Sequence, residues 1–204
     1  MTPWSKFFTD KISKILTEKK SVIDIGGGLR ATPGRGNRHN PAHKWMVPLI
    51  DKIDYMILDP VDTYKPDIIG DIHNLPFGDN TQDAILCLAV LEHVENPIQA
   101  YKEIYRTLKL GGYALIYVPF LYYYHAEKGY YGDFWRFTED GLRWLSKPFS
   151  QVEIQSVRGA IGTWIRLSFL GRYKFTEHLA NLADRLTGRL LSKQTSGYYV
   201  FLIK

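Results

Sequence analysis

The stretch VIDIGGG, residues 22–28, decides the fold class. Its apolar run, Val22 to Ile25, ends directly in three glycines, as a buried strand does when it enters a tight turn. A glycine-rich turn after the first strand lets the backbone approach a ligand closely, where a side chain would clash. The stretch therefore predicts the first strand of a parallel sheet, with a ligand-binding crevice at its carboxyl end.

Helical and strand patterns alternate on both sides of this stretch. Apolar spacing predicts helices over residues 4–19 and 43–53, the second shortened by Pro48. Further strands are predicted over residues 54–59, 67–70, 112–120, 149–158 and 197–204, and residues 82–94 are predicted to be a strand that runs into a loop. The alternation predicts a doubly wound, mostly parallel α/β sheet.

Two helix starts carry clear capping residues. Asn96 is a good N-cap with Pro97 at the first helical position, and we expect this helix to end at Gly111-Gly112. Thr138 is the expected N-cap of a helix over 139–146. Residues 161–191 read as mostly helical, with basic residues scattered among apolar ones.

Composition sets limits without naming a function. The 204 residues are 45% hydrophobic and 23% charged, with no apolar run long enough for a membrane span and no signal-peptide pattern at the N-terminus. Cys87 is the single cysteine, which excludes an intrachain disulfide and makes a cytoplasmic location the default expectation. The formal charge of +5 suits an anionic partner but is too modest to identify one.

One acidic residue follows or ends each of three successive strands. Asp24, just before the glycines, can receive a cationic ammonium group, directly or through water. Asp59 can accept hydrogen bonds from two ribose hydroxyls, and Asp71 with Ile72 is placed to meet the edge and face of an adenine. A nicotinamide dinucleotide is the alternative ligand, but the Asp24 carboxylate would repel its pyrophosphate.

The chain resembles the class I S-adenosylmethionine-dependent methyltransferases, and within them the type 11-like enzymes of bacterial glycan and lipid biosynthesis. The matching motifs are DIGGG at 24–28, LD at 58–59, DIHNLPF at 71–77, LAVLEHVENP at 88–97, LKLGG at 108–112 and ALIYVPF at 114–120. The resemblance implies a Rossmann-like, seven-stranded sheet with an antiparallel last strand, here preceded by a helical insertion. Arg30 replaces the family's usual third glycine, and the loop over 29–42 is longer than usual, so roles for Arg35 or Arg38 are left open.

The resemblance also implies a set of donor-binding residues. Asp24 and the glycines would line the methionine part, Asp59 the ribose, and Asp71 with Ile72 the adenine. Leu88 and Ala89 would border the sulfonium, and His93 would lie at the mouth of the site. The complete predicted set for S-adenosyl-L-methionine is Asp24, Gly26, Gly27, Gly28, Asp59, Pro60, Asp71, Ile72, Leu88 and Ala89.

The segment YHAEKGYYGDFWRFTEDG, residues 124–141, follows the fifth strand, where the donor methyl would point. His125 is the first candidate for a general base, since a neutral imidazole is available near pH 7. Asp133 is the second, acting as a base or as the group that orients His125. Acceptor contacts are predicted for His93, Tyr124, Tyr131, Trp135 and Arg136. An internal structural role for Trp135 and Arg136 is an open alternative.

We expect a single domain over residues 1–204. Its predicted parts are an N-terminal helix (1–20), a cofactor-binding core (21–120), an acceptor-side segment (121–148), a helical insertion (160–192) and the last strand (196–204). The basic, amphipathic insertion over 161–191 is consistent with packing on its own domain, a lid, a dimer face or peripheral contact with an anionic membrane. His39 and His43 lack ligand spacing to any acidic cluster, so no metal site is predicted.

The predicted activity is methyl transfer to a small molecule, with a hydroxyl of a sugar, glycan precursor or glycolipid as the leading acceptor. An RNA methyltransferase is the rival enzyme, disfavoured because the chain shows no appended RNA-binding module and no Asn-Pro-Pro-aromatic loop. A noncatalytic binding or scaffold protein with the same fold is the rival outside enzymes. The sequence leaves the oligomeric state open.

Overall fold

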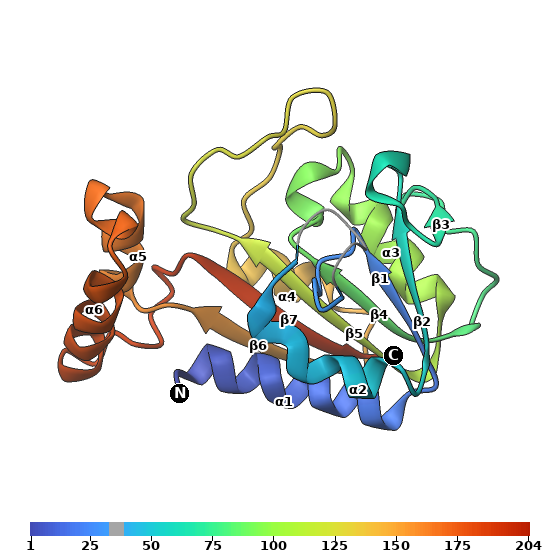
Figure 1. Cartoon of the computed structure of the whole chain (residues 1–204), viewed down its shortest axis with the longest axis horizontal. Coiled ribbons are helices and arrows are strands. Elements are labelled where there is room, and N and C mark those ends of the chain that lie inside the picture. The colour runs from blue at the N-terminus through green and yellow to red at the C-terminus, as the bar shows by residue number, and fades with distance from the viewer. Residues whose placement is uncertain (33–38) are drawn as a thin grey trace.

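The computed structural model describes residues 1–32 and 39–204 of the chain. Its seven strands form one sheet in the order β3-β2-β1-β4-β5-β7-β6 (Figure 1). The strands are β1 (Ser21–Ile25), β2 (Asp54–Asp59), β3 (Ile68–Ile69), β4 (Gln82–Leu88), β5 (Leu108–Pro119), β6 (Gln151–Val157) and β7 (Gly197–Ile203). β7 pairs antiparallel with both β5 and β6, while β1 to β5 are parallel. The predicted sheet is confirmed, including its antiparallel last strand.

Helices cover both faces of the sheet, and the last two helices stand away from it, past the ends of β6 and β7 (Figure 1). They are α1 (Pro3–Glu18), α2 (Val47–Ile50), α3 (Pro97–Thr107), α4 (Glu139–Leu145), α5 (Ala160–Leu167) and α6 (Lys174–Leu186), with short 3-10 turns η1 (Pro41–Met46), η2 (Asp62–Tyr64), η3 (Leu91–His93) and η4 (Phe169–Arg172). Pro48 sits at the start of α2 and the helix is four residues long, as its position predicted.

Alternate residues of each central strand feed two separate cores. In β4, Ile85 and Cys87 pack in the cluster that contains α3 and α4 residues such as Ile104 and Leu142. Leu86, between them, packs in the cluster that contains residues of α1 and α2. This period of two places helices on each face and leaves the carboxyl ends of β1, β2 and β4 free to form a site.

The α3–β5 boundary differs from the prediction. The helix ends at Thr107, and β5 begins at Leu108, before the two glycines. Gly111 adopts a φ of 72° and donates its N–H to the carbonyl of Lys204, while Lys204 donates back to Gly112. The glycines therefore join β5 to the C-terminal residue instead of ending a helix.

The N-terminal ends of α3 and α4 form where their capping residues predict. Asn96 accepts a hydrogen bond from the Gln99 N–H and Thr138 accepts one from the Gly141 N–H. The third strand is only two residues long, shorter than the 67–70 predicted. Among the described residues, no helix is both long enough and apolar enough to cross a bilayer.

Candidate active site

A cavity of about 550 Å³ opens at the carboxyl ends of β1, β2 and β4. One wall consists of residues that end or follow these strands, including Gly26, Asp59 and Ala89. The opposite wall comes from residues 122–131, the loop after β5. The cavity thus joins the glycine-rich turn to the aromatic loop, two segments far apart in the chain.

Asp24 holds the glycine-rich turn from behind the cavity. The side chain is fully buried and accepts hydrogen bonds from the N–H groups of Gly28 (3.1 Å) and Leu29 (2.9 Å) and from the Tyr55 hydroxyl (2.6 Å). Burial raises the pKa of Asp24 to about 6, against the opposing effect of these hydrogen bonds. Its carboxylate therefore organises the turn, and it is absent from the cavity lining.

The turn requires glycine at two positions for different reasons. Gly26 has a φ of 75°, and a Cβ there would lie 2.5 Å from Val90 Cγ2. At Gly28 a Cβ would lie 2.5 Å from the carbonyl oxygen of Leu88. The glycines thus allow the β1 turn to pack directly on the end of β4.

Two carboxylates lie on the donor side of the cavity wall. Asp59 accepts a hydrogen bond from the Val61 N–H (2.8 Å) through Oδ1, and burial raises its pKa. Asp71 accepts the His73 N–H (2.9 Å) through its own Oδ1. Each carboxylate has a second oxygen available in principle to a ligand, because a carboxylate offers about four lone-pair directions.

The loop after β5 is anchored to η3, the turn after β4. The Glu92 carbonyl accepts hydrogen bonds from the N–H groups of Phe134 (2.7 Å) and Trp135 (3.2 Å). The Trp135 indole N–H donates to the Val94 carbonyl (2.9 Å). These contacts hold the aromatic loop over the end of β4. They give Trp135 a structural role, as an anchor of the loop.

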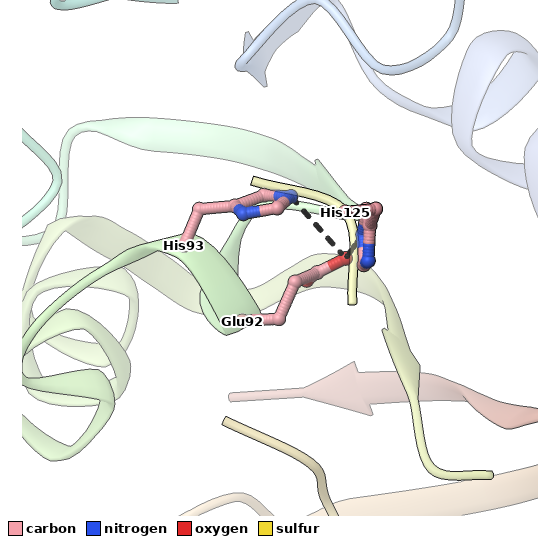
Figure 2. A group of neighbouring side chains, drawn as sticks. All are labelled: Glu92, His93 and His125. Carbon is pink, nitrogen blue, oxygen red and sulfur yellow. Dashed lines mark ion pairs between the residues drawn. The ribbon is translucent and has the colours of Figure 1, made fainter. Parts of the chain in front are cut away.

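His125 lies on this loop with its imidazole at the cavity wall. Its backbone N–H donates to Asp133 Oδ2 (2.8 Å), and its Nδ1 lies 3.1 Å from the Tyr123 carbonyl and 3.3 Å from Asp133 Oδ2. Its Nε2 lies 3.6 Å from Glu92 Oε1 (Figure 2). The Glu92 carboxylate, with smaller help from Asp133, raises the pKa of His125 above the ordinary value.

Asp133 is held by Arg136. Both guanidinium Nη atoms donate to its two carboxylate oxygens, and Arg136 also donates to the carbonyls of Tyr122, Tyr123 and Trp135. The Arg136 hydrogen bonds lower the pKa of Asp133 to about 2. A carboxylate this acidic is a poor base near neutral pH, so the geometry supports the orienting role among the two predicted for Asp133.

Comparison with known proteins gives a consistent match. Residues 41–116 match the family described as "Methyltransferase domain". Over 152 residues the chain is 27% identical to the rice chloroplast 2-methyl-6-phytyl-1,4-hydroquinone methyltransferase 2, covering 70% of this chain and 42% of that protein. Over 42 residues it is 45% identical to rice cycloartenol-C-24-methyltransferase 1, covering 21% of this chain and 12% of that protein.

The fold match extends over nearly the whole chain. An S-adenosylmethionine-dependent methyltransferase from Archaeoglobus fulgidus superposes with a TM-score of 0.62 at 13% identity, covering 98% of this chain and 93% of that one. The chain thus has the fold of the S-adenosylmethionine-dependent methyltransferases, and the predicted fold class is confirmed. The methyltransferase match over residues 41–116 supports the predicted family and methyl donor. The chain spans less than half the length of the rice and spinach hydroquinone methyltransferases that it matches.

The fold brings most of the predicted donor residues to one surface. The cavity is lined by Gly26, Asp59, Pro60, Asp71, Ile72, Leu88 and Ala89. Asp24, Gly27 and Gly28 lie behind that lining, in the turn itself. Ala89 adopts a φ of 59°, unusual for a residue other than glycine, and donates its N–H to the Tyr117 carbonyl at the end of the neighbouring strand. The contacts of each residue with the donor remain predictions.

The predicted acceptor residues divide in the same way. His93, His125 and Tyr131 line the cavity, whereas Tyr124, Asp133, Trp135 and Arg136 do not. Tyr124 is exposed on the outside of the loop. Arg35 and Arg38, whose roles the sequence left open, lie outside the described residues.

Sequence reasoning missed two contributors, Tyr64 and Arg166. Tyr64 in η2 stacks on Tyr130 with ring centroids 5.5 Å apart, and both line the cavity. Arg166 of α5 lies 3.4 Å from the hydroxyls of Tyr122 and Tyr123, which links the helical insertion to the aromatic loop. Such contacts between distant segments leave no local pattern in the sequence.

The sequence leaves Glu92, which follows β4 beside His93, evenly balanced between a structural and a functional role, and it is not among the predicted site residues. Among the described residues, Glu92, His93 and His125 place one carboxylate oxygen and two imidazole nitrogens within 4.8 Å of one another. Glu92 and His93 are adjacent in η3, but only the fold brings His125 to them. No metal site was predicted, because the histidines singled out for that purpose were His39 and His43.

Proposed function

We propose that the protein transfers the methyl group of S-adenosylmethionine to a hydroxyl of a small-molecule acceptor that enters the cavity beside His125. The observation that carries this proposal is the continuity of the cavity. The donor-side carboxylates of Asp59 and Asp71 and the imidazole of His125 line the same space. A donor held by the former would present its methyl group to an acceptor held near the latter.

The proposed chemistry is an in-line displacement at the methyl carbon. The acceptor oxygen forms a bond to the methyl group as the carbon–sulfur bond breaks, leaving S-adenosylhomocysteine and a methyl ether. The hydroxyl proton passes to His125 Nε2, which is the basic nitrogen because Nδ1 faces the Tyr123 carbonyl, an acceptor only. Asp133 fixes the loop through the His125 N–H, and the cavity walls position the two substrates.

The proposed acceptor is amphipathic, a sugar or ring hydroxyl linked to a lipid. Tyr64, Tyr122, Tyr123, Tyr130 and Tyr131 supply aromatic surface around the acceptor side of the cavity, suited to stacking on a sugar or ring face. Two relatives are named for lipid-type acceptors, a phytyl hydroquinone and the sterol cycloartenol. These names support a lipid-linked acceptor without distinguishing its head group.

The helical insertion supports the same acceptor class. The chain from 160 to 193 holds six basic and two acidic residues, a formal +4 out of the chain's +5. Four residues of α6 at helical spacing are exposed and apolar, namely Phe175, Leu179, Leu182 and Leu186. An apolar stripe with basic residues around it is the composition of a helix that rests on an anionic membrane surface. We therefore propose peripheral membrane contact through this segment.

The first experiment is calorimetric titration with S-adenosylhomocysteine, with NAD as the control. We expect micromolar binding of the first and none of the second. Donor labelled on its methyl group is then offered to lipid, glycan and RNA fractions. Label in a lipid or lipid-linked glycan supports the proposal, and label in RNA replaces it with the rival enzyme. Donor binding without label in any fraction favours a noncatalytic protein.

A further inference from the structure

Glu92, His93 and His125 form a compact group at the wall of the cavity. Glu92 Oε1 lies 3.8 Å from His93 Nε2 and 3.6 Å from His125 Nε2. Figure 2 shows the carboxylate reaching toward both imidazoles from below. These separations exceed a hydrogen bond. They are only slightly longer than the roughly 3.3 Å between two ligands that bind one ion tetrahedrally at about 2.0–2.1 Å.

Both imidazoles have the tautomer that a metal ligand requires. His93 Nδ1 lies 2.6 Å from the Gly132 carbonyl, and His125 Nδ1 lies 3.1 Å from the Tyr123 carbonyl. A carbonyl can only accept, so each Nδ1 carries the hydrogen and each Nε2 presents a lone pair toward Glu92. A carbonyl behind the non-ligating nitrogen is the usual arrangement around metal-bound histidines.

Glu92 supplies an independent observation. Only 1% of its surface is exposed, and its Oε2 is buried without a hydrogen-bond partner. A buried polar oxygen without a partner is costly. A cation bound through Oε1, the oxygen that faces both imidazoles, would offset the cost of burying this carboxylate, since the cationic side chain of Arg136 is already directed at Asp133.

We propose that Glu92, His93 and His125 bind one first-row divalent transition-metal ion of the zinc type. Two imidazoles and one carboxylate favour such an ion over Mg²⁺ or Ca²⁺, which prefer sets of oxygen ligands. Three protein ligands leave at least one position open, and the positions of His93 and His125 in the lining direct it toward the cavity.

The catalytic consequence rests on the proposed function. An acceptor hydroxyl bound at the open position would be acidified by the ion, and its proton would leave to water. His125 would then act as a ligand to the ion, and the ion would replace its imidazole as the group that activates the hydroxyl. The binding of the ion itself is measurable without any turnover.

The test uses the untagged protein, stripped with a chelator and then dialysed. Zn²⁺ binding is measured by calorimetry and Co²⁺ binding by its visible absorption, which reports nitrogen and oxygen coordination. The variants are Glu92→Gln, His93→Gln and His125→Gln. His39→Gln is the matched control, because His39 is exposed and outside the group. S-adenosylhomocysteine binding by each variant reports whether the fold is intact.

We expect one Zn²⁺ per chain, bound at least tenfold more weakly by each of the three variants and equally well by the control. Mg²⁺ at the same concentration should not compete. Absence of stoichiometric binding, or equal binding by all four variants, would overturn the metal site. If the protein binds the donor but not zinc, the metal site is wrong and the proposed function is retained. If it binds zinc but not the donor, the metal site is retained and the proposed function is wrong.

Discussion

Asp59 ends β2 with one oxygen bonded to the Val61 N–H and lies at the cavity wall. Replacing it with alanine should remove a charged acceptor for the ribose hydroxyls of the donor. Hydrogen bonds to charged groups contribute about 1.5–3 kcal/mol, so affinity for S-adenosylhomocysteine should fall roughly 10- to 150-fold. Calorimetry checks this, with the exposed neighbour Asp62→Ala as the control. Unchanged affinity in Asp59→Ala would remove the ribose assignment.

His125 should control the acid limb of the rate profile. Because Glu92 raises its pKa, the imidazole keeps its proton to a pH above its ordinary 6.5. The neutral base is therefore lost as pH falls through that raised pKa, and turnover should fall with it. Initial rates from pH 5 to 9, at saturating donor, measure the midpoint. A midpoint below 6.5 would contradict the contact with Glu92.

His125→Ala separates chemistry from donor binding. The side chain lies on the acceptor wall, so donor affinity should be nearly unchanged while turnover falls more than tenfold. Calorimetry and labelled methyl transfer on the same preparation give the two values. Full activity in this variant would mean that the imidazole is not needed, either as a base or as a ligand.

The sequence predicted the positions of single site residues where these depend only on neighbouring residues in the chain. Asp59 ends its strand and Asp71 follows a short one, so their positions followed from strand prediction alone. Arg136 and Asp133 are three residues apart, and their pairing is the internal structural role that the sequence left open for Arg136. The Glu92 contact with His125 was not predictable, because α3 and β5 lie between them in the chain.

At the scale of elements, the steric limit on the glycine-rich turn can be tested separately from its backbone strain. Gly26→Ala places a Cβ 2.5 Å from Val90 Cγ2 at a φ of 75°. Gly111→Ala meets a similar φ of 72° with no atom within 4 Å, so it is a matched control for backbone strain alone. We expect both to lose about 1 kcal/mol of stability from strain, with an additional loss and weakened donor binding only in Gly26→Ala.

Thermal unfolding and calorimetry, made on both variants, separate the two effects. Equal donor affinity in Gly26→Ala and the wild type would show that Val90 yields and that the turn tolerates a side chain. Weakened donor binding in Gly111→Ala would instead point to a change that spreads from β5.

Element boundaries were predicted less well than element types. The β5 start was misplaced because two glycines after a helical pattern usually end a helix, whereas here they pair with the C-terminal residue. That pairing depends on β7, which comes almost a hundred residues later, so nothing in the sequence near the glycines indicates it. β2, whose predicted residues 54–59 contain their own apolar run, was placed correctly because its signal is local.

The whole molecule concentrates its excess charge and its exposed apolar side chains in the insertion. Vesicles of phosphatidylglycerol should therefore bind the protein, and vesicles of phosphatidylcholine should not. A double substitution, Leu179→Ser with Leu182→Ser, should abolish cosedimentation without unfolding the domain, because both side chains are exposed. Leu110→Ser is the control, since Leu110 is equally apolar and exposed, but on β5. Raised salt should weaken binding.

A different occupant of this surface would give a different result. If wild-type protein sediments as a dimer, and the Leu179→Ser and Leu182→Ser protein as a monomer without any vesicle binding by either, the face joins two copies of the chain. Equal binding to both vesicle types would mean that burial of apolar side chains drives the contact and that the basic residues do not contribute to it.

The two helices of the insertion, α5 and α6, are also joined by hydrogen bonds to each other. Asp184 of α6 is fully buried and accepts the N–H groups of Ile161 and Gly162, so it caps α5 from within the same unit. The unit leaves the sheet after Val157 and returns before Gly197, two residues that are paired neighbours in β6 and β7. A tight turn can join them without altering the sheet. A segment of this kind can therefore be exchanged as a cassette, by recombination at one hairpin, while the sheet that carries the cavity is left unchanged.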